Sequence, residues 1–261
     1  MVIIHHALLL YNYSLQSIVQ YTLGHAVPLF LLVTILLYYT KYDQNIESAI
    51  NYRRIAKTIV FPYILLQMIL IPLAFYSGRD LSNCLIKFGI GMGSYYVALF
   101  LQIIFLSKYM FIILKRNFEL SAICIFLCFI LTELLFVKID LDQYVYRLLF
   151  TRYIFLFVIA YLLFNSNLFI KYRKLLIFFA IVGFFLQVGS IQLGHNYYLF
   201  PSSGFPTHKI YRDFITIWIF GTIWKCYSFF PNKFVVFLGK HSYNIFLLQM
   251  FVFFIIETLL R

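Results

Sequence analysis

The sequence predicts an all-α polytopic membrane protein, with about nine transmembrane helices (range eight to ten) in a single helical bundle. Three observations indicate this class: 63% of the 261 residues are hydrophobic, only 11% are charged, and the mean hydropathy is +0.90. Soluble domains are roughly 45–50% apolar and about 25% charged, so this chain could not cover its apolar surface in water. Soluble enzymes, nucleic-acid-binding modules and disordered regions are thereby excluded, and membrane lipid is the expected environment.

The apolar residues fall into nine segments that approach or reach the roughly 20 residues needed to cross a membrane as a helix. The first is the shortest. Because it has neither a basic start nor a small-residue cleavage site, we interpret it as the end of a helix, not as a signal peptide. One segment carries Cys124 and Cys128, which we expect to be buried helix residues. The nine segments are Met1–Tyr13, Thr22–Tyr39, Thr58–Tyr76, Tyr95–Leu114, Leu120–Val137, Leu148–Phe164, Leu175–Ile191, Phe214–Phe230 and Ser242–Leu260.

Basic residues indicate which ends of these segments face the cytoplasm. If the segments alternate in direction, 13 of the 21 Lys and Arg residues but only three of the nine acidic residues lie on one side. Lys and Arg gather in cytoplasmic loops, so this side is predicted to be cytoplasmic, and the net charge of +12 requires no nucleic-acid partner. The cytoplasmic set is Lys41, Arg53, Arg54, Lys57, Lys108, Lys115, Arg116, Lys171, Arg173, Lys174, Lys225, Lys233 and Lys240, with Asp43, Glu47 and Glu119.

Two histidines in the first apolar segment are candidates for acid–base chemistry. Ionisable groups at membrane depth are costly and usually face a cavity or the interior of the bundle. An imidazole titrates near neutral pH and is the common general base for activating a hydroxyl, which makes His5 and His6 candidate catalytic residues. The alternative is a buried histidine that only bonds a neighbouring helix, and the sequence does not choose between the two positions.

A basic cluster precedes the helix that contains Pro62. Arg53, Arg54 and Lys57 are explained by membrane topology alone. They also suit an anion site for the phosphates of a cytosolic acyl donor, because Arg53 or Arg54 shares a helical face with Lys57.

Three weaker features complete the candidates. Glu133 and Arg152 could pair near the outer ends of neighbouring helices. Gly89 and Gly93 have a GxxxG spacing, which favours helix packing or a bend over a phosphate-binding loop. The four cysteines form no CxxC or Cys/His cluster, so no metal site is expected.

Several stretches together resemble the membrane-bound acyltransferase-3 family. In the basic motif that begins at Tyr52, Lys57 stands where the family has its second arginine. In the stretch that begins at Leu238, Gln249 stands where the family has a histidine. The stretch of this chain that begins at Gly93 resembles the fourth-helix segment of one branch of the family. That branch acts on bacterial exopolysaccharide and includes the intercellular-adhesin type. The stretches are the second-helix segment His25–Leu32 (HAVPLFLL), the fourth-helix segment Gly93–Gln102 (GSYYVALFLQ), the basic motif Tyr52–Lys57 (YRRIAK) followed by Pro62-Tyr63, and Leu238–Gln249 (LGKHSYNIFLLQ).

The resemblance implies an integral O-acyltransferase of the bacterial inner (cytoplasmic) membrane. Such an enzyme moves an acyl group, with acetyl the first choice, from cytosolic acyl-CoA to a hydroxyl of a cell-surface polysaccharide or its lipid-linked precursor. It holds no bound cofactor, since acyl-CoA is a substrate, and it could act as a homo-oligomer or within a polysaccharide-synthesis complex. By this resemblance His5 or His6 is the base, and Arg53, Arg54 and Lys57 bind the donor. Tyr95 and Gln102 are candidate donors to the reaction's oxyanion.

The chain departs from the family at both ends. The family has ten helices and an Arg about ten residues before its first-helix His. This chain keeps the His but has neither that Arg nor a tenth helix, so we expect residues 1–261 to form a single acyltransferase-3-like transmembrane domain that is incomplete at both ends.

Two other classes of envelope protein are polytopic. A polysaccharide polymerase would carry a large, Arg-rich outer loop, whereas the longest one here, Gln192–Asp213, has only Lys209 and Arg212. A glycan flippase or transporter would favour inverted repeats, and the sequence shows none.

Overall fold

The computed structural model describes residues 26–44, 50–78, 88–90, 94–139, 145, 148–192 and 233–259. Within this part of the chain every regular element is a helix and none is a strand. The all-helical class predicted from the sequence is therefore confirmed for the described residues. The predicted segments Met1–Tyr13 and Phe214–Phe230 lie outside them.

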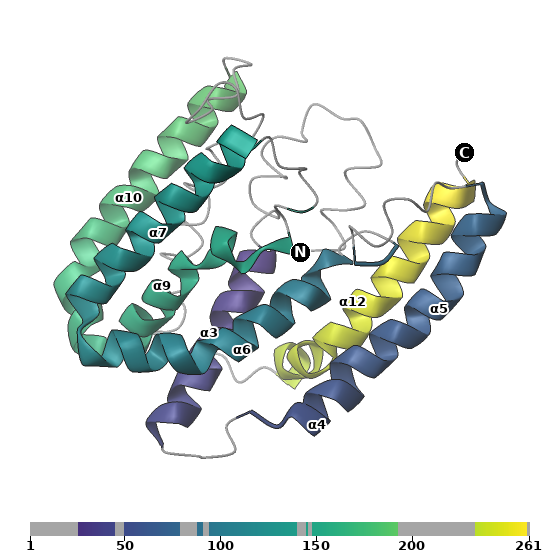
Figure 1. The fold of residues 1–261 in the computed structure, drawn as a ribbon, viewed down its shortest axis with the longest axis horizontal. Coiled ribbons are helices and arrows are strands. Elements are labelled where there is room, and N and C mark those ends of the chain that lie inside the picture. The colour runs from purple at the N-terminus through teal and green to yellow at the C-terminus, as the bar shows by residue number, and fades with distance from the viewer. Residues whose placement is uncertain are drawn as a thin grey trace.

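The other seven predicted segments each coincide with a helix (Figure 1). One of them is a continuous helix over Tyr52–Tyr76, here called the long helix, made of α4, a π-helical turn η1 and α5. The bounds are α3 Ala26–Asp43, α4 Tyr52–Ile55, η1 Ala56–Val60, α5 Phe61–Tyr76, α6 Tyr95–Arg116, α7 Phe118–Ile139, η2 Phe150–Tyr153, α9 Phe155–Phe164, α10 Ser166–Gln192 and α12 Lys233–Leu259.

Several helices extend beyond the apolar segments that predicted them. Helix α10 begins at Ser166, nine positions before the expected Leu175, because Asn165 starts it: the Asn165 Oδ1 accepts hydrogen bonds from the N–H groups of Asn167 and Leu168 at 3.2 and 3.3 Å. Hydropathy detects only the apolar part of a helix, whereas the backbone hydrogen bonds continue into its basic end.

The buried core centres on α9, which contacts α3, α6, α7 and α10. Tyr39 of α3 is fully buried, and its hydroxyl donates to the Phe157 carbonyl oxygen of α9 at 3.4 Å. Helices α5 and α12 pack against each other at the opposite end of the molecule from α7 and α10 (Figure 1). Helices α3 and α6 lie between these two ends (Figure 1).

Among the described residues, two helices, the long helix and α6, are long and apolar enough to cross a membrane. Large apolar side chains of the long helix, among them Leu65, Met68 and Phe75, are exposed. A water-soluble fold would bury such a helix, so its outward apolar face suits contact with lipid.

The prediction that Cys124 and Cys128 are buried is wrong, since both are exposed. Helix α7 turns Ile125 and Phe129 inward, toward the core that contains α9. The two cysteines are each one position earlier, about 100° around the helix, and therefore face outward.

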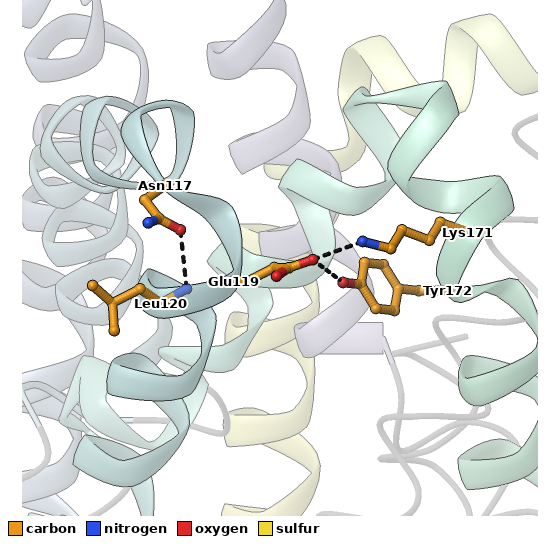
Figure 2. Close-up of polar contacts among 5 residues, drawn as sticks. All are labelled: Asn117, Glu119, Leu120, Lys171 and Tyr172. Carbon is orange, nitrogen blue, oxygen red and sulfur yellow. Dashed lines mark hydrogen bonds and ion pairs between the residues drawn. The ribbon is translucent and has the colours of Figure 1, made fainter.

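Polar contacts join helix ends that the sequence assigned to the same side of the membrane. The Lys115 Nζ lies 3.1 Å from the Asp43 Oδ1, which joins the C-terminal ends of α6 and α3. Glu119 in the first turn of α7 accepts hydrogen bonds from Lys171 Nζ at 2.7 Å and from the Tyr172 hydroxyl at 2.8 Å, both in α10 (Figure 2). These four helix ends therefore lie on the same side of the molecule.

The Glu119 bridge is expected to give folding stability a pH dependence. The hydrogen bond from Lys171, and then that from Tyr172, lower the pKa of Glu119 below 4.5, and the bond to Glu119 raises the pKa of Lys171 above 10.5. A lowered carboxyl pKa adds stability that is lost as the pH falls below about 4.5, and a raised lysine pKa adds stability that is lost above about 10.5. Thermal unfolding between about pH 7 and pH 3 should therefore depend less on pH in Glu119→Gln than in the wild type. Because the pair is exposed the difference is small, Tyr172→Phe should lie between the two proteins, and equal pH profiles would contradict the bridge.

Candidate functional site

Several predicted site residues lie outside the described residues. His5 and His6, the candidate catalytic bases, are among them, as is the Glu133 side chain. Arg152, the expected partner of Glu133, lies over the ring of Tyr153 at 5.3 Å. The roles of these residues stay predictions. Within the described residues, no group of three or more His, Cys, Asp and Glu side chains could hold a metal ion.

The candidate donor-binding residues Arg53, Arg54 and Lys57 lie together near the start of the long helix. Asn51 begins this helix, because its Oδ1 accepts a hydrogen bond from the Arg54 N–H at 2.9 Å. The three basic side chains are exposed, and neither ion pair found among the described residues includes them. Three cations within about one and a half helical turns, at a helix N-terminus and with no acidic partner in the described part of the chain, suit the binding of phosphate groups.

A π-helical turn, Ala56–Val60, follows the two arginines and includes Lys57. Pro62 lies two residues after its end and has no N–H, so one bond of the regular hydrogen-bond ladder is missing here. The Ile59 carbonyl oxygen of this turn accepts a hydrogen bond from the Tyr243 hydroxyl of α12 at 2.6 Å. Short π-helical turns often occur at functional sites, and this one joins the basic end of the long helix to α12.

Aromatic side chains from three helices meet around Tyr96 of α6, and we call Phe30, Tyr96 and Phe246 the aromatic junction. The ring centroid of Tyr96 lies 5.5 Å from that of Phe30 in α3 and 5.3 Å from that of Phe246 in α12, both edge-on. The Phe246 ring also contacts that of Tyr243, at 6.2 Å. Each ring of the junction comes from a different one of the stretches that carry the family resemblance, and Tyr243 connects them to the basic stretch.

The chain that follows the long helix returns to the middle of that helix. The Gln67 Nε2 donates to the Ile90 carbonyl oxygen at 3.1 Å, and the Ile90 N–H donates to the Gln67 Oε1 at 2.7 Å. The buried Tyr63 hydroxyl lies within hydrogen-bond reach of the carbonyl oxygens of Phe88 and, at 3.2 Å, of Ser94. Helix α6 therefore begins beside the middle of the long helix, and Tyr96 lies in its first turn.

Gln102, a candidate oxyanion donor, bonds two backbone groups in the structure. Its Nε2 donates to the Leu148 carbonyl oxygen at 2.9 Å, and its Oε1 accepts from the Phe150 N–H at 3.1 Å. The amide thus holds the start of η2 against α6. Of the two adjacent tyrosines in the first turn of α6, Tyr95 is half-buried, whereas Tyr96 is 5% exposed.

Sequence reasoning did not single out Tyr96, Tyr243 or Gln67. Gln67 had a usable signal, because it is the one polar amide in an apolar helix, where a polar side chain needs a partner. Tyr243 and Tyr96 lie in stretches that carry the family resemblance, but their contacts depend on helices distant in sequence, which no local pattern encodes. The chain matches no model of a known protein family, no curated protein and no solved structure.

Proposed function

We propose that this protein is a multi-pass O-acyltransferase of the bacterial cytoplasmic membrane. It moves an acyl group, with acetyl the first choice, from cytosolic acyl-CoA to a hydroxyl of a cell-surface polysaccharide or its lipid-linked precursor. Its single bundle would contain about nine transmembrane helices, and a homo-oligomer or a polysaccharide-synthesis complex is compatible with this role.

One observation carries the proposal: the stretches that resemble the acyltransferase-3 family meet in space although they are distant in sequence. Tyr243 bonds the carbonyl oxygen of Ile59, which is two residues after Lys57, and Phe246 packs against Tyr96. An exposed group of cations thus lies next to an aromatic junction whose central side chain, Tyr96, is buried. This arrangement suits a substrate with anionic phosphates at one end and a reactive acyl group at the other.

In the proposed reaction, Arg53, Arg54 and Lys57 hold the phosphates of acyl-CoA at the cytoplasmic surface. The acyl group enters the interior of the bundle, where the acceptor hydroxyl attacks the thioester carbonyl carbon. His5 or His6 takes the proton of that hydroxyl. The charges orient the donor, and the base supplies the proton transfer.

The test of this function is consumption of acyl-CoA by the purified full chain. Acetyl-, propionyl- and succinyl-CoA labelled in the acyl group would be incubated with the protein and with polysaccharide from cells that carry the gene, after mild alkali has removed its ester groups. Transfer of label to the polysaccharide is the expected result. A polysaccharide polymerase or a flippase would leave the acyl-CoA unchanged, and that outcome would reject the proposal.

Neutralising the basic cluster should weaken donor binding without slowing the chemistry. In the triple variant Arg53→Gln, Arg54→Gln and Lys57→Gln, the KM for acyl-CoA is expected to rise roughly 10- to 100-fold with little change in kcat, because contacts to phosphate act equally in the ground and transition states.

A matched triple variant separates this effect from the loss of surface charge. Arg116, Arg173 and Lys174 are also exposed and outside the two ion pairs, so changing them to Gln removes the same charge elsewhere. Their triple variant should keep the wild-type KM. Equal effects of the two triples would show that only overall charge matters.

A further inference from the structure

The hydroxyl of Tyr96 has no hydrogen-bond partner among the described residues, although the side chain is 5% exposed. A buried hydroxyl without a partner loses its bonds to water and gains nothing in return, so folded proteins keep few of them. Phenylalanine would fill the same space without this cost. The Tyr96 hydroxyl therefore calls for a partner that is absent from the described residues, and a bound substrate is one such partner.

Two other buried polar atoms in the described residues share this property, the Tyr42 hydroxyl and the Thr151 Oγ1. Tyr42 lies at the end of α3, next to the Asp43–Lys115 ion pair, and Thr151 lies in η2. Neither belongs to the junction where the three helices meet. Tyr96 alone of the three combines an unpartnered hydroxyl with the stretches on which the proposed function depends.

The surroundings of Tyr96 are apolar, because its ring contacts Phe30, Phe100 and Phe246. The nearby Tyr243 hydroxyl is already bonded to the Ile59 carbonyl oxygen. In such a low-dielectric setting a hydrogen bond to a developing negative charge is much stronger than in water. The Tyr96 hydroxyl is thus the available donor of this junction.

The backbone adds a second favourable feature at the same place. Tyr96 lies in the first turn of α6, a helix of 22 residues. The first N–H groups of a helix have no partner within it and carry a partial positive charge, which favours negative charge nearby. The hydrogen bonds of Tyr63 and Gln67 to the chain just before α6, here called the clamp, hold this helix start beside the middle of the long helix. The partial charge therefore acts in the interior of the bundle.

We propose that Tyr96 is a catalytic residue whose hydroxyl donates a hydrogen bond to the thioester carbonyl oxygen of acyl-CoA as that oxygen becomes negative; this inference rests on the proposed function. The acceptor oxygen forms a bond to the carbonyl carbon, and the carbonyl π pair moves onto the oxygen facing Tyr96. When the C=O bond re-forms, the C–S bond breaks. The CoA sulfur leaves with the electron pair of the C–S bond and takes the proton lost by the acceptor hydroxyl. Tyr96 keeps its own proton throughout.

The test compares Tyr96→Phe with Tyr39→Phe in the purified full chain. Both tyrosines are buried, but the Tyr39 hydroxyl has a partner, the Phe157 carbonyl oxygen. Steady-state rates with the labelled acyl-CoA that the wild type uses, and thermal unfolding, would be measured for each. Tyr96→Phe should lose roughly 100- to 1,000-fold in kcat with KM for acyl-CoA nearly unchanged and without a lower melting temperature. Tyr39→Phe should show the reverse, a lower melting temperature with kcat unchanged.

A Tyr96→Phe protein with kcat within about threefold of the wild type would overturn the proposal, since loss of one oxyanion donor costs far more. A melting temperature lowered as much as that of Tyr39→Phe would also overturn it, because the hydroxyl would then have a structural partner. A wild-type chain that transfers no acyl group from any of the three donors would instead reject the proposed function, and this inference with it. The wild-type rate therefore separates the two failures.

Discussion

Replacing both His5 and His6 with Gln is expected to lower kcat for acyl transfer by a factor of about 10² to 10⁴, the contribution of a positioned general base. The acceptor hydroxyl is a weak acid, so its proton must leave as its oxygen attacks the thioester. Imidazole can accept that proton near neutral pH. KM for acyl-CoA should change little, because the proposed donor contacts come from the basic cluster. Transfer of label from acyl-CoA to polysaccharide measures the effect.

The two single variants, His5→Gln and His6→Gln, identify the base, since only one of them should reproduce the loss. A double variant of His195 and His208, in the longest predicted outer loop, is the matched control and should keep the wild-type kcat. In the wild type, kcat should rise with pH as the histidine that acts as base loses its proton, and should level off once it is neutral. Undiminished acylation of the polysaccharide in the His5/His6 double variant would reject both residues as the base.

The helices could be predicted from the sequence because each depends on a local property. A run of apolar residues of sufficient length is enough, and the segment expected from Tyr95 begins at Tyr95 in the structure. The polar ends were less accurate. Helix α12 begins at Lys233, whereas its apolar segment predicted Ser242, because lysine and glycine in its first turns lower the hydropathy without ending the helix.

The arrangement of the candidate site could be predicted only in part. The cations Arg53, Arg54 and Lys57 are adjacent in sequence, so their common location followed from helix periodicity. The hydrogen bond from Tyr243 to Ile59 joins residues 184 positions apart, and no local pattern encodes it. No local pattern shows which of Tyr95 and Tyr96 is the buried one, either, because that depends on which of them packs against α3 and α12.

Gly89 shows how a motif and its physical role can differ. The GxxxG spacing of Gly89 and Gly93 predicted either helix packing or a bend. The structure confirms the bend at Gly89, where the backbone is not helical and φ is +129°. The reason for glycine is the close approach of the Tyr63 and Gln67 side chains, which the sequence spacing does not reveal.

Gly89→Ala is accordingly expected to be strongly destabilising, by about 3 kcal/mol or more. A Cβ at this position would lie 2.5 Å from the Tyr63 hydroxyl and 2.7 Å from the Gln67 Cδ and Oε1. Both side chains would have to move and release the backbone of Phe88 and Ile90, and the positive φ adds strain of its own.

Gly78→Ala provides the matched control, because Gly78 also has a positive φ, +70°, but nothing lies within 4 Å of its added Cβ. It should cost only the backbone strain, roughly 1–2 kcal/mol, so the difference between the two variants measures the close approach. Thermal unfolding in detergent gives both values. The free-energy cost of Gln67→Ala should be smaller in the Gly89→Ala protein than in the wild type. In the Gly89→Ala protein the hydrogen bonds of Gln67 to Ile90 are already lost, and removing the Gln67 side chain makes room for the new methyl group. Equal stabilities for Gly89→Ala and Gly78→Ala, or additive effects of Gly89→Ala and Gln67→Ala, would show that the clamp does not hold the start of α6 in place.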